Sequence, residues 1–144
     1  MYNDIWKRQA INDLEMYGAK KRALINIPAQ IKELEEKLIS IRSQTADSVS
    51  VKGGGGSRDD AYLNNIVARD RLSANLEETR RYVSRIDGAL SILTAVEMEL
   101  LDSRWISKEE NAVSNLARRL DKDPRTINRM INEALFKFTT AMYG

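Results

Sequence analysis

Arginine and asparagine side chains recur at helical spacing in the segment 124–138. Arg125 and Arg129 are four residues apart, and Asn128 and Asn132 repeat that spacing, so the four are expected on one helical face. Arginine pairs bidentately with guanine, and asparagine pairs with adenine, in the major groove of duplex DNA. The chemistry open to these residues is therefore hydrogen bonding to base edges.

The surrounding sequence has the layout of a helix-turn-helix over 112–138. A short helix with apolar Val113, Leu116, Ala117 and Leu120 leads to a polar turn at 121–123. Asp123 is suited to the N-cap of a second helix and Pro124 to its first position. The second helix is expected to bury Ile127, Met130, Ile131, Ala134, Leu135 and Phe138. The predicted DNA-binding residues are Arg118, Lys122, Arg125, Thr126, Asn128, Arg129 and Asn132, with Arg118 and Lys122 mainly on phosphate.

Composition excludes several kinds of site. The 144 residues carry a formal net charge of +2 and include neither cysteine nor histidine. The commonest zinc ligands, the commonest general base and the cysteine nucleophile are therefore missing. Acidic pairs such as Glu35–Glu36 are adjacent and do not share a helical face. We expect no enzyme activity, no cofactor and no metal.

The location is also an expectation from composition. No apolar run approaches the roughly 18 residues that would span a bilayer, and residues 1–16 lack the apolar core of a signal peptide. These observations predict a cytoplasmic protein without a membrane partner.

Two heptad patterns predict an all-α fold with a long antiparallel coiled-coil hairpin. The first pattern is Ile27, Ile31, Leu34, Leu38 and Ile41, and the second is Leu72, Leu76, Thr79, Val83, Ile86, Leu90 and Leu93. A glycine-rich loop near 44–58 joins them, and the second helix is expected to run on from about 59 to 103. Pro28 should break or kink the first helix. Domains are predicted at 1–93 for the hairpin and 94–144 for the DNA-binding part.

Further details of the hairpin remain as alternatives. The short arm cannot cover the long one, so the N-terminal helix or a second copy of the chain would complete the seam, the latter giving a homo-oligomer. The run Gly53–Gly56 lacks the Gly-Lys-Ser/Thr ending of a phosphate-binding loop, which favours a flexible turn, either native or an engineered linker. Ser107 and Glu110 have the spacing of a capping box for the helix that follows.

Two resemblances extend this interpretation. The segments 98–101, 125–130 and 132–138, with Leu116 and Leu120, resemble region 4 of bacterial primary sigma factors, whose recognition helix reads the promoter −35 element. Pro124 stands where that family usually has a polar residue. Over nearly its full length, including 84–90, the chain is similar to the ArpU/RinA-type regulators of phages and prophages of Gram-positive bacteria. That resemblance implies a late-gene transcriptional activator in the bacterial host cytoplasm, with duplex DNA and RNA polymerase as partners.

Three functions follow in order of preference. The first is a sequence-specific DNA-binding transcriptional regulator, an activator of phage or prophage late genes. The second is a phage small terminase subunit, which joins a helix-turn-helix to oligomerising helices for DNA packaging. The third is a coiled-coil adaptor without DNA, in which 112–138 would be a plain helical pair with a polar exterior.

Overall fold

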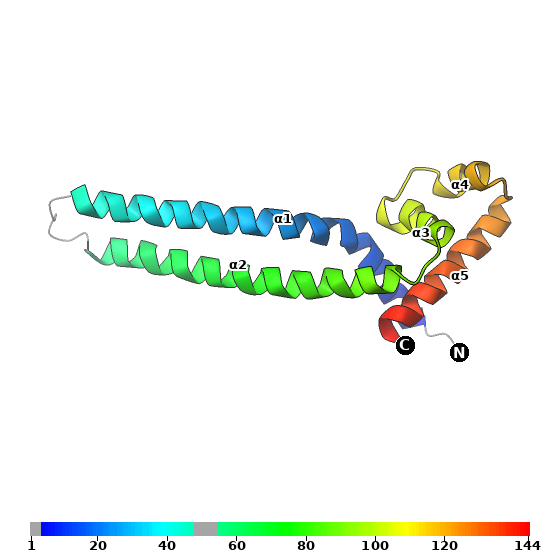
Figure 1. Ribbon diagram of the computed structural model, residues 1–144, viewed down its shortest axis with the longest axis horizontal. Coiled ribbons are helices and arrows are strands. Elements are labelled where there is room, and N and C mark those ends of the chain that lie inside the picture. Colours follow the sequence, from blue (N-terminus) through cyan, green and yellow to red (C-terminus); the bar gives the residue numbers. More distant parts are fainter. Residues whose placement is uncertain (1–3, 48–54) are drawn as a thin grey trace. The chain divides into compact units, whose positions relative to one another are not determined.

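Every regular element of the protein is a helix in the ranges that the computed structural model describes, 4–47 and 55–144 (Figure 1). The order is α1 (Asp4–Asp47), α2 (Gly55–Leu90), α3 (Ala95–Leu101), the π-helix η1 (Asp102–Ile106), α4 (Ala112–Leu120) and α5 (Pro124–Tyr143). The expected all-α class is confirmed for these residues. The centre of the predicted loop, 48–54, lies outside them.

The chain divides into two compact units, and each is described by itself. One unit joins Met1–Lys21 to Arg81–Gly144, and the other is Arg22–Arg80. Both units therefore contain part of α1 and part of α2. This division does not coincide with the boundary at residue 93 that the sequence suggested.

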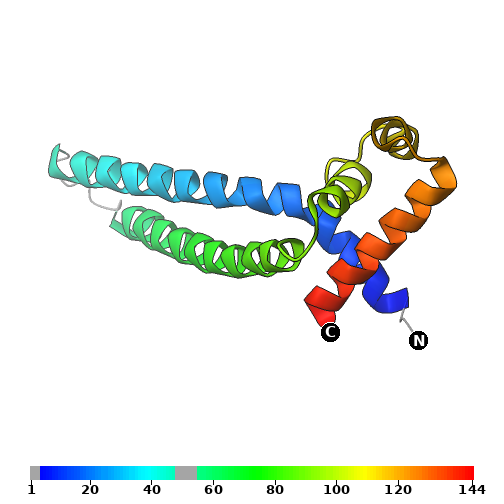
Figure 2. The same ribbon diagram turned by 45° about the vertical axis from the view of Figure 1, so that its right-hand side comes forward.

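In the unit Arg22–Arg80, segments of α1 and α2 run side by side in opposite directions, as both views show (Figures 1 and 2). The buried residues lie three or eleven positions apart along each helix, which places them on one face: Ile27 and Leu38 on α1, and Asn65, Leu76 and Thr79 on α2. Buried Asn65 donates from Nδ2 to the Leu34 carbonyl at 2.8 Å and accepts from Arg69 Nε at 2.9 Å. Both the nitrogen and the oxygen of its side-chain amide therefore have a hydrogen-bond partner within this unit.

Two helices end elsewhere than expected: α1 does not break at Pro28, and α2 does not run on to residue 103. Pro28 lies inside α1, which continues unbroken to Asp47. The Pro28 ring is exposed, and the buried seam residues Ile27 and Leu38 precede and follow it, so the seam continues past the lost backbone hydrogen bond. The second long helix ends at Leu90 rather than near 103. A turn follows, and Thr94 then caps α3 with Glu97 as its capping-box partner.

The capping box expected at Ser107 is also wrong. Ser107 follows η1 and donates from Oγ to Asp102 Oδ1 at 3.0 Å. The N-cap of α4 is Asn111, in the left-handed region with φ 57° and without a side-chain cap. The start of α2 differs as well, because the helix begins at Gly55 and not near residue 59.

A fully buried carboxylate, Asp13, joins three helices of the unit formed by Met1–Lys21 and Arg81–Gly144. It accepts hydrogen bonds from the Tyr82 hydroxyl of α2 at 2.6 Å and from the Tyr143 hydroxyl of α5. Gln9 Nε2 donates to the same carboxylate at 3.2 Å. One turn further along α1, Tyr17 donates to Asp87 of α2. The N-terminal helix therefore covers this part of α2, as one of the two sequence alternatives proposed.

Candidate nucleic-acid interface

The candidate interface is built on a small apolar core shared by α3, α4 and α5. Leu100, Leu116, Ile127 and Ile131 are buried together, and half-buried residues pack against them: Val113, Ala117, Leu120 and Met130. Along α5, Ala134, Leu135 and Phe138 continue the buried stripe. Of the six α5 positions expected in the core, five are buried and Met130 is half-buried. This stripe fixes which face of α5 remains outside.

The turn between α4 and α5 is short and locally determined. Asp121 ends α4 in the left-handed region, with φ 54°, a conformation that aspartate tolerates better than most residues. Asp123 then caps α5, because its Oδ1 accepts the backbone N–H of Thr126 at 2.7 Å. That hydrogen bond lowers the pKa of the Asp123 carboxyl. Pro124 occupies the first turn of α5, as the sequence predicted.

The outer face of α5 carries the predicted base-contacting side chains. Arg125, Asn128, Arg129 and Asn132 are all exposed, whereas Thr126 is half-buried against the cap. The only ion pair among them in the described residues joins Arg129 Nε to Glu133 Oε1 at 3.9 Å. A pair so long and exposed contributes at most a few tenths of a kcal/mol. These donors are therefore available to a ligand at little cost.

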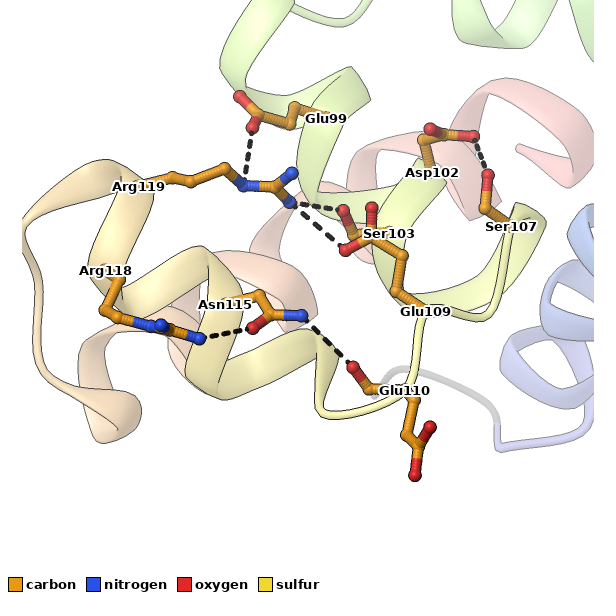
Figure 3. A network of polar contacts seen from close by, with 9 residues as sticks. All are labelled: Glu99, Asp102, Ser103, Ser107, Glu109, Glu110, Asn115, Arg118 and Arg119. Carbon is orange, nitrogen blue, oxygen red and sulfur yellow. Dashed lines mark hydrogen bonds and ion pairs between the residues drawn. The ribbon is translucent and has the colours of Figure 1, made fainter.

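The adjacent arginines of α4 have different roles (Figure 3). Arg119 crosses to neighbouring elements: its Nε lies 3.3 Å from Glu99 of α3, and its Nη2 donates to buried Ser103 of η1 at 2.8 Å. Nη2 also lies 3.4 Å from Glu109. Arg119 thus fastens α4 to α3 and η1, a role that the sequence analysis did not assign.

Arg118 stays on its own helix and is exposed. Its Nη2 donates to Asn115 Oδ1 at 2.7 Å, and Asn115 Nδ2 donates to the Glu110 carbonyl at 3.1 Å (Figure 3). This chain of contacts holds Nη2 of the guanidinium against α4, while the residue as a whole is exposed. Lys122, in the turn, is exposed.

The far half of α5 is fastened to its surroundings. Lys137 Nζ lies 2.7 Å from Glu97 Oε2 of α3, and this hydrogen bond is the main cause of the lowered pKa of the Glu97 carboxyl. Near the C-terminal end, the Tyr143 ring packs against Trp6 of α1 with centroids 4.9 Å apart. The later turns of α5 are therefore held by polar and aromatic contacts to α3 and α1, in addition to the apolar core that holds its first turns.

The described residues contain no cluster of three or more acidic, histidine or cysteine side chains able to hold a metal ion. Within the same ranges, no helix combines the length and apolarity needed to cross a bilayer. Comparison of the sequence with known protein families, with curated proteins and with solved structures found no match.

Proposed function

We propose that the protein is a sequence-specific DNA-binding transcriptional regulator, with α4 and α5 forming a helix-turn-helix and α5 entering the major groove. One observation carries the proposal. Arg125, Asn128, Arg129 and Asn132 project from one exposed face of α5, while its opposite face is locked into a buried core. A rigid helix with outward arginine and asparagine is the arrangement that direct readout of base edges uses.

The flanking charges support the same orientation. Arg118 on α4 and Lys122 in the turn are exposed near the start of α5, where the DNA backbone would pass. Phosphate contacts of this kind fix the register of a protein on the duplex without reading sequence. In the proposed complex, Arg118 and Lys122 position α5, and its arginines and asparagines select bases. Thr126 lies beside them as a minor contact.

Activation of phage or prophage late genes in a bacterial host, with contact to RNA polymerase, is proposed on the sequence resemblance alone. Transcription in vitro from a bound promoter tests it, with increased transcript as the expected result. Repression from the same site would exclude the activator role and leave DNA recognition intact.

The binding proposal is tested by fluorescence anisotropy with a selected duplex and single alanine variants. Arg125→Ala and Arg129→Ala should each lose about 1–3 kcal/mol and relax preference at one or two base pairs. Lys122→Ala should weaken every sequence alike and reduce the slope of log K against log salt by about one unit. Arg71→Ala removes the same charge from an exposed site on α2 and should change neither quantity.

The same measurements separate the alternatives. Absence of salt-sensitive duplex binding would contradict the proposal and favour an adaptor that works without DNA. Binding by a large ring of subunits would favour the small terminase subunit, since packaging proteins of that kind assemble as rings.

A further inference from the structure

Several large apolar side chains are exposed in the described part of the unit Arg22–Arg80. Ile39 of α1 is 63% exposed, and on α2 Leu63 is 58% and Val67 41% exposed. Ile66, which is half-buried, lies between Leu63 and Val67 in the sequence. Side chains of this size are usually turned inward, so a side of the hairpin on which they gather indicates a contact surface.

The seam positions show that these residues share a side. The a and d positions of the two heptads are defined by the buried and half-buried residues of the seam. These are Ile31, Leu34 and Leu38 of α1, and Asn65, Leu72 and Leu76 of α2. With that assignment Ile39 and Leu63 both occupy position b, and Ile66 occupies position e. In an antiparallel pair the e positions of the two helices adjoin, and position b lies next to e on each helix. We call this side, made of the b and e positions, the b/e side.

The opposite side is polar. Its outer positions hold Asn26, Glu33 and Ser40 on α1, and Asn64, Arg71 and Glu78 on α2, and all six are exposed. Burial of the apolar side chains on the b/e side would leave these polar positions outside, with Val67 at position f between the two sides. The contrast indicates one additional contact surface for this unit.

Two of the charges on the b/e side, Lys32 and Asp70, indicate the partner. Arg42 Nη2 donates to the Tyr62 hydroxyl at 2.9 Å, so these two residues lie at a similar position along the hairpin. Because the two helices are antiparallel, other pairs of α1 and α2 residues whose numbers add up to a similar total also lie level with each other. Ile39 then lies level with Leu63, and one heptad away Lys32 lies level with Asp70. Lys32 and Asp70 are exposed, and neither makes an ion pair within the described part of the chain.

A two-fold axis along the helices places α1 of one copy over α2 of the other. Ile39 then faces the second copy's Leu63, and Lys32 faces the second copy's Asp70, each twice by symmetry. One heptad beyond Lys32 and Asp70, Ile25 lies level with Glu77. An apolar side chain and a carboxylate are not complementary, so the contact ends before these two residues. We infer that the b/e side binds a second copy of this chain, in a parallel dimer built from these two rows.

This dimer differs from one formed by an uncovered heptad seam, because the seams here are closed within the chain. It also does not depend on DNA. Apolar contact between Ile39 and Leu63 supplies most of the attraction, and the pair Lys32 and Asp70 fixes the orientation, since the antiparallel alternative does not place those two charges opposite each other.

Sedimentation equilibrium of the full chain tests the inference. The wild type should have about twice the chain mass of 16.4 kDa. Leu63→Asp should sediment as a single chain, and the neighbouring variant Asn64→Asp should remain a dimer. Both residues are exposed, so circular dichroism should show unchanged helix content in both.

A charge exchange tests the orientation. Lys32→Asp and Asp70→Lys should each raise the dimer dissociation constant at least about tenfold, because each change sets like charges opposite each other twice. The double variant should return it to near the wild-type value. A monomeric wild type, equal behaviour of Leu63→Asp and Asn64→Asp, or no recovery in the double variant would overturn the inference.

Discussion

Removal of the Tyr143 hydroxyl isolates the contact that fastens the end of α5 to α1. Tyr143→Phe keeps the ring and its packing on Trp6, and deletes one of the hydrogen bonds to buried Asp13. A hydrogen bond to a charged group contributes about 1.5–3 kcal/mol. Because Tyr143 is half-buried and Tyr82 still donates to Asp13, we expect a loss near the lower end, about 1.5 kcal/mol.

Urea unfolding followed by circular dichroism measures this loss as a lower midpoint with an unchanged slope. Tyr62→Phe is the matched control, because the Tyr62 hydroxyl accepts a hydrogen bond from exposed Arg42 at 2.9 Å and not from a buried group. That variant should lose no more than about 0.5 kcal/mol. Hydrogen exchange should also become faster at the last turns of α5 in Tyr143→Phe alone. Equal stability of the two variants would refute the role given to Asp13.

Three further outcomes follow. Ile86→Asp should cost roughly 3 kcal/mol or more, because it places an unpaired charge at a fully buried position, while exposed Ser84→Asp should be near neutral in thermal melting. Burial is the largest cause, and the hydrogen bond to an aspartate the second, of a pKa raised from 10.0 to about 12 for both Tyr17 and Tyr143. Because the folded state holds these protons more tightly, the contribution of these tyrosines to stability should be constant below about pH 10 and be lost between pH 10 and 12, and the loss should be smaller in Tyr143→Phe. Arg119→Ala should lower the melting temperature more than Arg118→Ala, since it removes contacts to α3 and η1; the reverse order would contradict the assignment in Figure 3.

Local patterns in the sequence predicted the segment α4–α5 well. The apolar spacing identified the buried face of α5, and Asp123 with Pro124 identified its start, because caps and helical periodicity depend on residues only a few positions apart. The same periodicity failed at the end of α2. Leu93 continues the heptad beyond Leu90, although the chain turns there, and the local signal for a new helix was the capping box of Thr94 and Glu97.

Contacts between distant residues could not be predicted in this way. Asp13 reads as one more polar residue of a solvated helix, and its partners Tyr82 and Tyr143 lie 69 and 130 positions away. Arg118 and Arg119 are chemically identical neighbours, and only the position of Ser103 shows which of them turns inward. The exposed positions of Arg125, Asn128, Arg129 and Asn132 agree with the face expected from spacing, whereas their binding to bases remains a prediction.

Selection of bound sequences from a random duplex pool tests the central proposal most directly, since it measures binding and specificity together. The wild-type chain should enrich a defined motif, and the Arg125→Ala, Arg129→Ala double variant should fold normally but enrich that motif weakly or not at all. Both arginines are exposed, so their loss leaves the α5 core intact. If the folded double variant selects the same motif with the same affinity, α5 does not read DNA and the proposed function is wrong.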